Sequence, residues 1–101
     1  MQLSTLLNTL HPVEVIGRSD IEINSIQFDS RLVGDGDLFV AQSGTSVDGH
    51  TFITHCISQG ARAIVLSNRD FLASDDNVTY ILVKDTNEAL GLLACEWYGN
   101  P

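Results

Sequence analysis

Two short, unbroken runs of apolar residues place the strongest constraint on how this chain can fold. They cover residues 38–41 and 63–66, and a third strand-like segment follows at residues 78–83. An unbroken apolar run bounded by turn residues is typical of a strand that is buried on both faces of a sheet. Since segments of helical periodicity separate these strands, the pattern favours an α/β fold with helices on both sides of the sheet.

Three segments have the spacing of amphipathic helices. Leucines recur at i, i+3, i+4 and i+7 within residues 3–10, and apolar residues share one face of residues 52–57. A third helix follows a cap at Asp85 or Thr86 and turns a face that includes Trp97 toward the core. These helices supply the two outer layers of a three-layer domain.

Two further segments, residues 13–16 and 21–28, predict weaker strands near the N-terminus. The alternation of the second slips phase at Asn24 and Ser25, which indicates either a bulge or two short strands. Strong turn chemistry at residues 34–37 then leads into the first buried run. This region favours a mixed sheet of about four to five strands over a purely parallel one.

The charge of the chain excludes two classes of partner. Thirteen acidic residues against five basic ones give a formal net charge of -8, which repels nucleic acids and anionic membranes. The chain has neither the basic start of a signal peptide nor an apolar run near the roughly 18 residues that a membrane span requires. We therefore expect a cytoplasmic protein without nucleic-acid or membrane partners.

Motifs for catalysis, cofactors and metals are missing from the sequence. It contains neither the glycine-rich phosphate loop of ATP-binding proteins nor the Gly-x-Gly-x-x-Gly dinucleotide motif. His50 and His55 are five residues apart and do not share a helical face, which argues against zinc. Cys56 and Cys95 lie among apolar residues at helical spacing, so we expect two reduced core thiols. The chain by itself is predicted to have no catalytic residue, cofactor or metal.

Polar residues nevertheless gather at two places where an α/β fold tends to bind ligands. The sequence Phe-Asp-Ser-Arg at residues 28–31 ends a predicted strand. The small residues of segment 44–50 let a ligand approach the backbone beside the N-terminus of a helix. Each place has a plain structural alternative, namely a strand-ending turn with a solvated ion pair and a loop that caps the next helix.

Together with their neighbours, these motifs resemble the N-terminal domain of the Mur ligases, the MurE type in particular. The likeness covers essentially the whole chain, and although no single motif is specific, four occur in register. The matching segments are Asp29-Ser30-Arg31, Gly36-Asp37-Leu38-Phe39-Val40-Ala41, Gly44 with Asp48-Gly49-His50 and Phe52-Ile53, and Gly60-Ala61 with Ala63-Ile64-Val65. The family commonly has proline where this chain has Asp35, which weakens the pre-organisation of one turn.

The resemblance implies that residues 1–101 form the substrate-binding N-terminal domain of a longer ligase of peptidoglycan biosynthesis. In such enzymes this domain holds the uridine diphosphate of UDP-N-acetylmuramoyl-dipeptide (UDP-MurNAc-L-Ala-D-Glu), to which the enzyme adds the third amino acid of the stem peptide. ATP and Mg²⁺ bind in the central domain and the C-terminal domain selects the amino acid. Those two domains are the implied protein partners, and the isolated chain is expected to be inactive.

Carried over by position, the resemblance also assigns roles to single residues. Phe28 and Ser30 match residues that contact the uridine. The loop beside the nucleotide matches Thr45, Ser46 and Val47. The residues expected to shape these loops first, and to contact the ligand second, are Asp29, Arg31, Asp48 and Gly49.

Two alternatives stay open at this point. The related MurF ligases share part of the pattern, including Val83-Lys84-Asp85-Thr86, whereas Asp48-Gly49-His50 and the ending Tyr98-Gly99-Asn100-Pro101 favour MurE. The other alternative is a stand-alone interaction module that has the same fold and binds no nucleotide. The choice between diaminopimelate and lysine as the added amino acid belongs to the selecting domain and cannot be made from this sequence.

Overall fold

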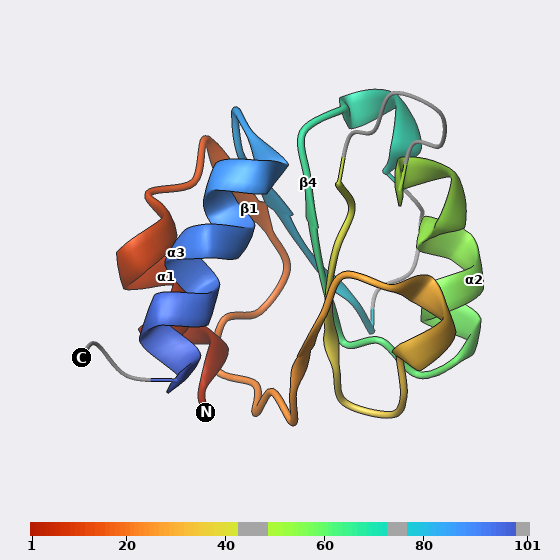
Figure 1. The fold of residues 1–101 in the computed structure, drawn as a ribbon, viewed down its shortest axis with the longest axis horizontal. Coiled ribbons are helices and arrows are strands. Elements are labelled where there is room, and N and C mark those ends of the chain that lie inside the picture. The colour runs from red at the N-terminus through yellow and green to blue at the C-terminus, as the bar shows by residue number, and fades with distance from the viewer. Residues whose placement is uncertain (43–48, 73–76, 99–101) are drawn as a thin grey trace.

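The computed structural model describes residues 1–42, 49–72 and 77–98 and shows a five-stranded sheet between two helical layers (Figure 1). The strands are β1 (Glu14–Ile16), β2 (Ile26–Gln27), β3 (Leu38–Val40), β4 (Ala63–Leu66) and β5 (Thr79–Leu82). The helices are α1 (Leu3–Leu10), α2 (Ile53–Ser58) and α3 (Thr86–Tyr98), with short 3-10 helices η1 (Ser30–Leu32), η2 (Gly49–Phe52) and η3 (Arg69–Phe71). Helices α1 and α3 cover one face of the sheet and α2 covers the other, which confirms the predicted three-layer α/β arrangement.

The order of the strands across the sheet is β1-β5-β4-β3-β2. Strands β2, β3, β4 and β5 run parallel to one another, and β1 pairs antiparallel with β5 at one edge. The predicted mixed sheet is therefore confirmed. Strand β4 lies in the centre, where Ile64 pairs with Phe39 of β3 and with Tyr80 of β5.

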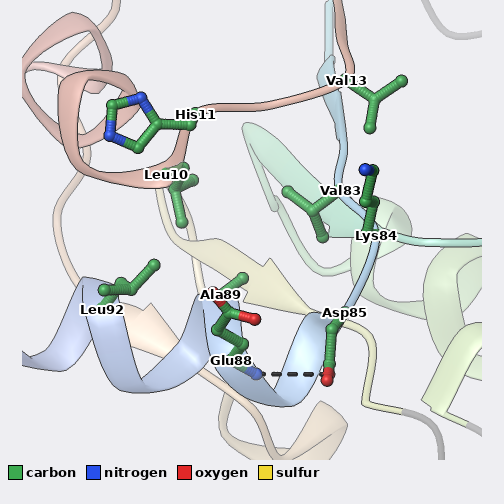
Figure 2. A pocket seen from close by; sticks show the side chains of 9 residues that line it. All are labelled: Leu10, His11, Val13, Val83, Lys84, Asp85, Glu88, Ala89 and Leu92. Atoms are coloured by element: carbon green, nitrogen blue, oxygen red, sulfur yellow. Dashed lines mark hydrogen bonds between the residues drawn. The ribbon is translucent and has the colours of Figure 1, made fainter.

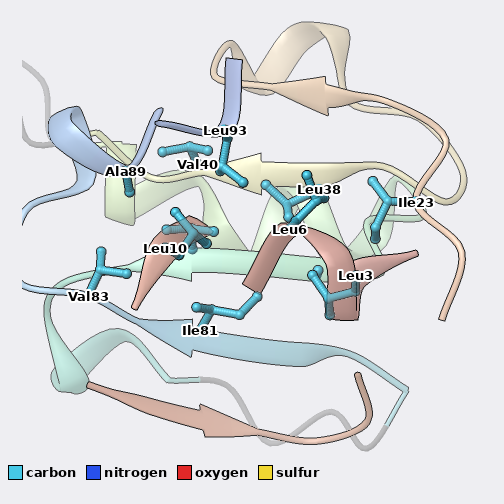
Figure 3. Packing of buried hydrophobic residues seen from close by; sticks show 12 residues of the cluster. Leu3, Leu6, Leu10, Ile23, Leu38, Val40, Ile81, Val83, Ala89 and Leu93 are labelled. Carbon is cyan, nitrogen blue, oxygen red and sulfur yellow. The ribbon is translucent and has the colours of Figure 1, made fainter. Parts of the chain in front are cut away.

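The unbroken apolar runs fill both faces of the sheet because successive side chains of a strand point to opposite sides. Leu38 and Val40 of β3 join a cluster with α1 and α3, which Figure 3 shows, whereas Phe39 belongs to a second cluster with α2. All three side chains are at most 1% exposed. Truncating such a side chain to alanine removes transfer energy and leaves a cavity, at a cost of about 2–5 kcal/mol.

The predicted strand at residues 21–28 divides into two pieces at the phase slip. Its second half pairs with β3 as β2, while Glu22 forms an isolated bridge with Gln2. Asn24 marks the division, because its N–H donates to the carbonyl of Gly36 (2.9 Å) in a turn. The sequence allowed either a bulge or two short strands, and the structure shows two short extended pieces.

Two side-chain placements expected from the sequence are wrong. Cys56 is buried as expected, but Cys95 is exposed on α3. The buried face of that helix passes through Ala89 and Leu93, and a residue two positions later points about 200° away from Leu93. Phe52, the first residue of the predicted apolar face, is 38% exposed because it belongs to η2 and α2 begins one residue later.

Helix α3 begins with a side-chain cap. Oδ1 of Asp85 accepts hydrogen bonds from the backbone N–H groups of Asn87 (2.9 Å) and Glu88 (3.3 Å). Asp85 is therefore the cap, and Thr86 is the first helical residue. Near the other end of the helix, Trp97 is half-buried against the cluster that α3 shares with α1.

Candidate functional site

The carboxyl ends of the four parallel strands point toward the same edge of the sheet. Strand β2 leads to Phe28, and β3 leads to Gln42. Ligands of open α/β sheets bind beyond the carboxyl ends of the strands. Both motifs that the sequence singled out, residues 28–31 and 44–50, follow strands that end on this side.

Phe28 is the exposed aromatic side chain of the first motif. It directly follows β2 and is 59% exposed. Single exposed apolar side chains are common on protein surfaces, so it is the position of this ring beyond a strand end, and not its exposure alone, that makes it a candidate. The ring offers a flat apolar face, which suits a planar heterocycle.

Asp29, the N-cap of η1, forms an ion pair with Arg31. Oδ1 of Asp29 accepts hydrogen bonds from the backbone N and from Nε of Arg31, both at 3.0 Å, and Oδ2 accepts one from Nη2 at 2.7 Å. These hydrogen bonds from Arg31 lower the pKa of Asp29 to about 2. The Arg31 side chain is 85% exposed, so the two residues form a solvated ion pair that shapes the turn.

Ser30 lies between this pair and is half-buried. Its carbonyl oxygen accepts a hydrogen bond of 2.7 Å from Nε2 of Gln59, directly after α2. Within the described part of the chain its hydroxyl makes no hydrogen bond, which leaves a donor and an acceptor for a ligand. Sequence reasoning missed Gln59, because no local pattern links residues that are 29 positions apart.

Gly49 makes a close backbone contact at the start of η2. Its N–H donates to the carbonyl of Gln42 at 2.7 Å. A Cβ atom on Gly49 would lie 2.8 Å from both the backbone N and the carbonyl oxygen of Gln42. Glycine is therefore required here by close approach rather than by a positive φ.

His50 fastens the start of η2 to the end of β4. It is 1% exposed, and its Nε2 accepts hydrogen bonds from the backbone N–H groups of Ser67 (2.9 Å) and Asn68 (3.3 Å). This acceptor role requires Nε2 to be unprotonated. The ring also lies 5.4 Å from that of Phe71. From the sequence, His50 was considered as a metal ligand, and this structural role was not predicted.

The remaining predicted site residues lie outside the described residues. They are Thr45, Ser46, Val47 and Asp48. The roles assigned to them stay predictions. The hydrogen bond between Gln42 and Gly49 joins the two described residues that flank this segment.

A cavity of about 260 Å³ opens at the junction of β5 and α3 (Figure 2). Side chains from α1 and α3, together with Val13 and Val83, supply its apolar wall, and Lys84, Asp85 and Glu88 supply charges. Figure 2 shows that the Asp85 carboxylate is already engaged as the helix cap. Neither Phe28 nor Ser30 lines this cavity, so it is separate from the predicted uridine contacts.

A family profile covers most of the chain. The profile described as "Mur ligase family, catalytic domain" matches residues 22–98. The chain belongs to the Mur ligase family. The matched region includes β2, η1, η2 and α2, so the candidate site lies within it.

Curated members of the Mur ligase family match over the entire chain. It is 45% identical over 103 residues to the UDP-N-acetylmuramoyl-L-alanyl-D-glutamate–2,6-diaminopimelate ligase of Bacteroides thetaiotaomicron, and 42% identical over 101 residues to the ligase of the same name from Bacillus cereus. Each match covers 100% of this chain, but 21% and 20% of the two relatives. The chain thus spans about a fifth of the length of these ligases. The expected relationship to the MurE type is confirmed.

Solved Mur ligase structures share the fold. MurF from Acinetobacter baumannii matches with a TM-score of 0.75 at 24% identity, over 94% of this chain and 20% of that one. MurF from Thermotoga maritima in complex with ADP matches with a TM-score of 0.62 at 34% identity, over 75% of this chain and 17% of that one. The fold is therefore the one predicted from the resemblance to MurE and MurF.

The described part of this Mur ligase chain contains neither a membrane-spanning helix nor a cluster of metal ligands. None of its helices is both long and apolar enough to cross a lipid bilayer. In residues 1–42, 49–72 and 77–98, no three His, Cys, Asp or Glu side chains are grouped so that they could hold a metal ion. At and beside η1 the groups that can contact a ligand are the Phe28 ring, the Ser30 hydroxyl, the exposed Arg31 guanidinium and the backbone.

Proposed function

We propose that residues 1–101 form the UDP-substrate-binding N-terminal domain of an ATP-dependent ligase of peptidoglycan biosynthesis. The ligase joins diaminopimelate to UDP-MurNAc-L-Ala-D-Glu as the third amino acid of the stem peptide. The observation that carries this proposal is a match along the entire chain, at 45% and 41% identity, to ligases named for diaminopimelate. The position of the exposed Phe28 and of the Ser30 hydroxyl supports it.

Uracil suits the groups at η1. It presents two carbonyl acceptors and one N–H donor, and a hydroxyl can both donate and accept. In this proposal the Ser30 hydroxyl bonds to the edge of uracil and the Phe28 ring covers its face. The further contacts come from Thr45, Ser46 and Val47, and the residues that hold the two loops in place are Asp29, Arg31, Asp48 and Gly49.

The domain supplies binding energy at a distance from the reacting carboxylate, and such remote binding orients the reacting group. The net charge of -8 opposes a diphosphate at long range, so the uridine end carries recognition and local N–H donors hold the diphosphate. ATP and Mg²⁺ act in a central domain, a C-terminal domain selects diaminopimelate, and the reaction takes place in the cytoplasm.

A titration of the isotope-labelled full-length protein with UDP tests the assignment. The amide signals of Phe28, Ser30 and Gly49 should shift, and ADP should shift them less at the same concentration. Gly91 lies exposed on α3, in the opposite layer, and its signal serves as the control. Shifts confined to α1, α3 and the cavity of Figure 2 would contradict the proposed site.

The reaction needs a separate assay. Labelled diaminopimelate should be transferred to UDP-MurNAc-L-Ala-D-Glu by the full-length protein in the presence of ATP and Mg²⁺, with lysine as the control amino acid. Transfer of lysine in preference to diaminopimelate would contradict the proposed specificity while leaving the uridine site intact.

A further inference from the structure

The end of α2 reaches across to the turn that carries Ser30. Nε2 of Gln59 donates a hydrogen bond of 2.7 Å to the Ser30 carbonyl, over 29 positions of sequence. The same residue ends the helix, because its backbone N–H donates to the carbonyls of His55 and Cys56, both at 3.1 Å. The backbone of Gln59 is therefore held by the helix while its side chain spans the gap to η1.

The residue after Gln59 fixes this end of α2 further. Gly60 has a φ of 108°, and its carbonyl accepts a hydrogen bond of 2.9 Å from the N–H of Gly36. A Cβ on Gly60 would lie 2.7 Å from Cα of Asp35, so the helix end and the turn are in close backbone contact. The Gln59 amide thus projects from a docked point rather than from a free helix end.

The backbone of Ser30 is held on both of its sides. The preceding peptide group is held through the Asp29 carbonyl, which accepts a hydrogen bond of 3.0 Å from the N–H of Leu32. The following peptide group is held twice, because its N–H, that of Arg31, donates to Asp29 Oδ1 at 3.0 Å and its carbonyl, that of Ser30, accepts from Gln59. With its peptide groups restrained, the Ser30 hydroxyl can move only by rotation about its χ1 torsion. Restraint of this kind reduces the ordering cost when a ligand binds.

We infer that Gln59 is a positioning residue for uridine recognition, one that acts by orienting Ser30 and does not itself touch the ligand. This inference rests on the proposed function, in which the Ser30 hydroxyl bonds to uracil. Nothing in the local sequence marks Gln59 for this role, because the contact depends on how α2 packs beside η1.

The test compares variants of the full-length protein by calorimetric titration with UDP. Gln59→Leu keeps most of the side-chain volume and removes the donor, and it should weaken UDP binding about threefold to tenfold. Gln59→Lys restores a long donor and should bind within about twofold of the wild type. Ser58→Ala is the matched control, since it removes a hydrogen bond at the same helix end, to His55 O at 2.6 Å, that does not reach η1.

A double-mutant cycle shows whether Gln59 acts through Ser30. In a Ser30→Ala background, Gln59→Leu should cause no further loss of UDP affinity, because the group that Gln59 orients is gone. In steady-state ligation, Gln59→Leu should raise KM for the UDP-linked substrate and leave kcat unchanged. Should Gln59→Leu fail to fold, Gln59→Glu, which turns an acceptor toward the Ser30 carbonyl, carries the same expectation.

The outcomes separate this inference from the proposed function. If Ser30→Ala binds UDP like the wild type, the contact assumed in the proposed function is wrong and the inference falls with it. If Ser30→Ala weakens binding but Gln59→Leu does not, the proposed function stands and the positioning role is overturned. Additive losses in the double variant overturn it as well, because they show that Gln59 does not act through Ser30.

Discussion

The two helical layers that cover the sheet are held in place by different kinds of contact. Helices α1 and α3, eight and thirteen residues long, lay apolar faces against one side of the sheet (Figures 1 and 3). The opposite layer holds α2, only six residues long, together with η1 and η2. There, hydrogen bonds of single side chains hold the short elements in place, from Gln59 to η1 and between His50 of η2 and the end of β4.

This difference follows from how each kind of element satisfies its backbone. A regular helix bonds most of its own N–H and C=O groups and can devote one face to apolar packing. Short turns leave polar groups that need partners elsewhere, and those partners fix where the turn points. The α1–α3 layer therefore mainly stabilises the sheet, and the α2 layer mainly positions the candidate site.

The largest effect should come from the stabilising layer. Leu93 is fully buried between α3 and the sheet, so Leu93→Ala should lower the free energy of unfolding by about 2–5 kcal/mol. Urea denaturation measures this loss. The UDP affinity of the folded protein should stay unchanged. A parallel fall in UDP affinity would contradict the separation of a stabilising layer from a layer that positions the site.

Gly49 probes the backbone packing of the other layer. In Gly49→Ala the new Cβ meets the backbone of Gln42 at 2.8 Å, so the chain must shift, at a cost of about 1–3 kcal/mol. UDP affinity should also fall, because the shifted residue adjoins the predicted nucleotide loop. The matched control is Gly91→Ala, which meets nothing within 4 Å on α3 and should stabilise the protein by about 0.5–1 kcal/mol. Equal destabilisation by both changes would contradict the close contact at Gly49.

Ser30→Ala should change binding without changing stability. Loss of one neutral hydrogen bond, about 1 kcal/mol, should weaken UDP binding roughly five- to tenfold in a calorimetric titration. The unfolding midpoint should stay near that of the wild type, because the hydroxyl has no partner within the described chain. Ser4→Ala, at an exposed position of α1, should leave UDP affinity untouched. An unaltered affinity in Ser30→Ala removes this hydroxyl from the site.

The smallest effect concerns pH. Asp29 has a pKa of about 2 in the folded chain against an ordinary 3.8, because of its hydrogen bonds with Arg31. A lowered folded pKa contributes stability that is present above the unfolded pKa and is lost as pH falls from about 4 to about 2. Since the pair is exposed and screened by salt, its effect on unfolding is small and is better followed by NMR titration of the carboxyl carbon. Arg31→Ala should raise the midpoint toward 3.8, and an unmoved midpoint would mean that the pair does not shape η1.

The sequence predicted the framework of the fold well and the site only in part. The apolar runs at residues 38–41 and 63–66 became central strands, and the leucine spacing of residues 3–10 became α1. These signals are local, since strand alternation and helical periodicity follow from backbone geometry. The motif at residues 28–31 was found because strand ends in α/β folds tend to bind ligands, and its parts are described in the structure.

What the sequence could not supply were the partners of single side chains. Cys95 was expected in the core and is exposed, because the face that α3 buries depends on how the helix is rotated against α1. The acceptor role of His50 requires β4 to end beside η2, and the reach of Gln59 requires α2 to end beside η1. None of these contacts can be predicted from the helical or strand periodicity of the sequence.

By itself, then, the sequence determined the number and kind of layers, the strands of the buried sheet and, by resemblance, the Mur ligase family. The tertiary structure decided the order of the strands, the antiparallel place of β1, and the two long-range contacts that hold the turns of the α2 layer. The physical reason is one of range. Periodicity is set by neighbouring residues along the chain, whereas a hydrogen bond between Gln59 and Ser30 exists only after packing has brought two distant segments within 3 Å.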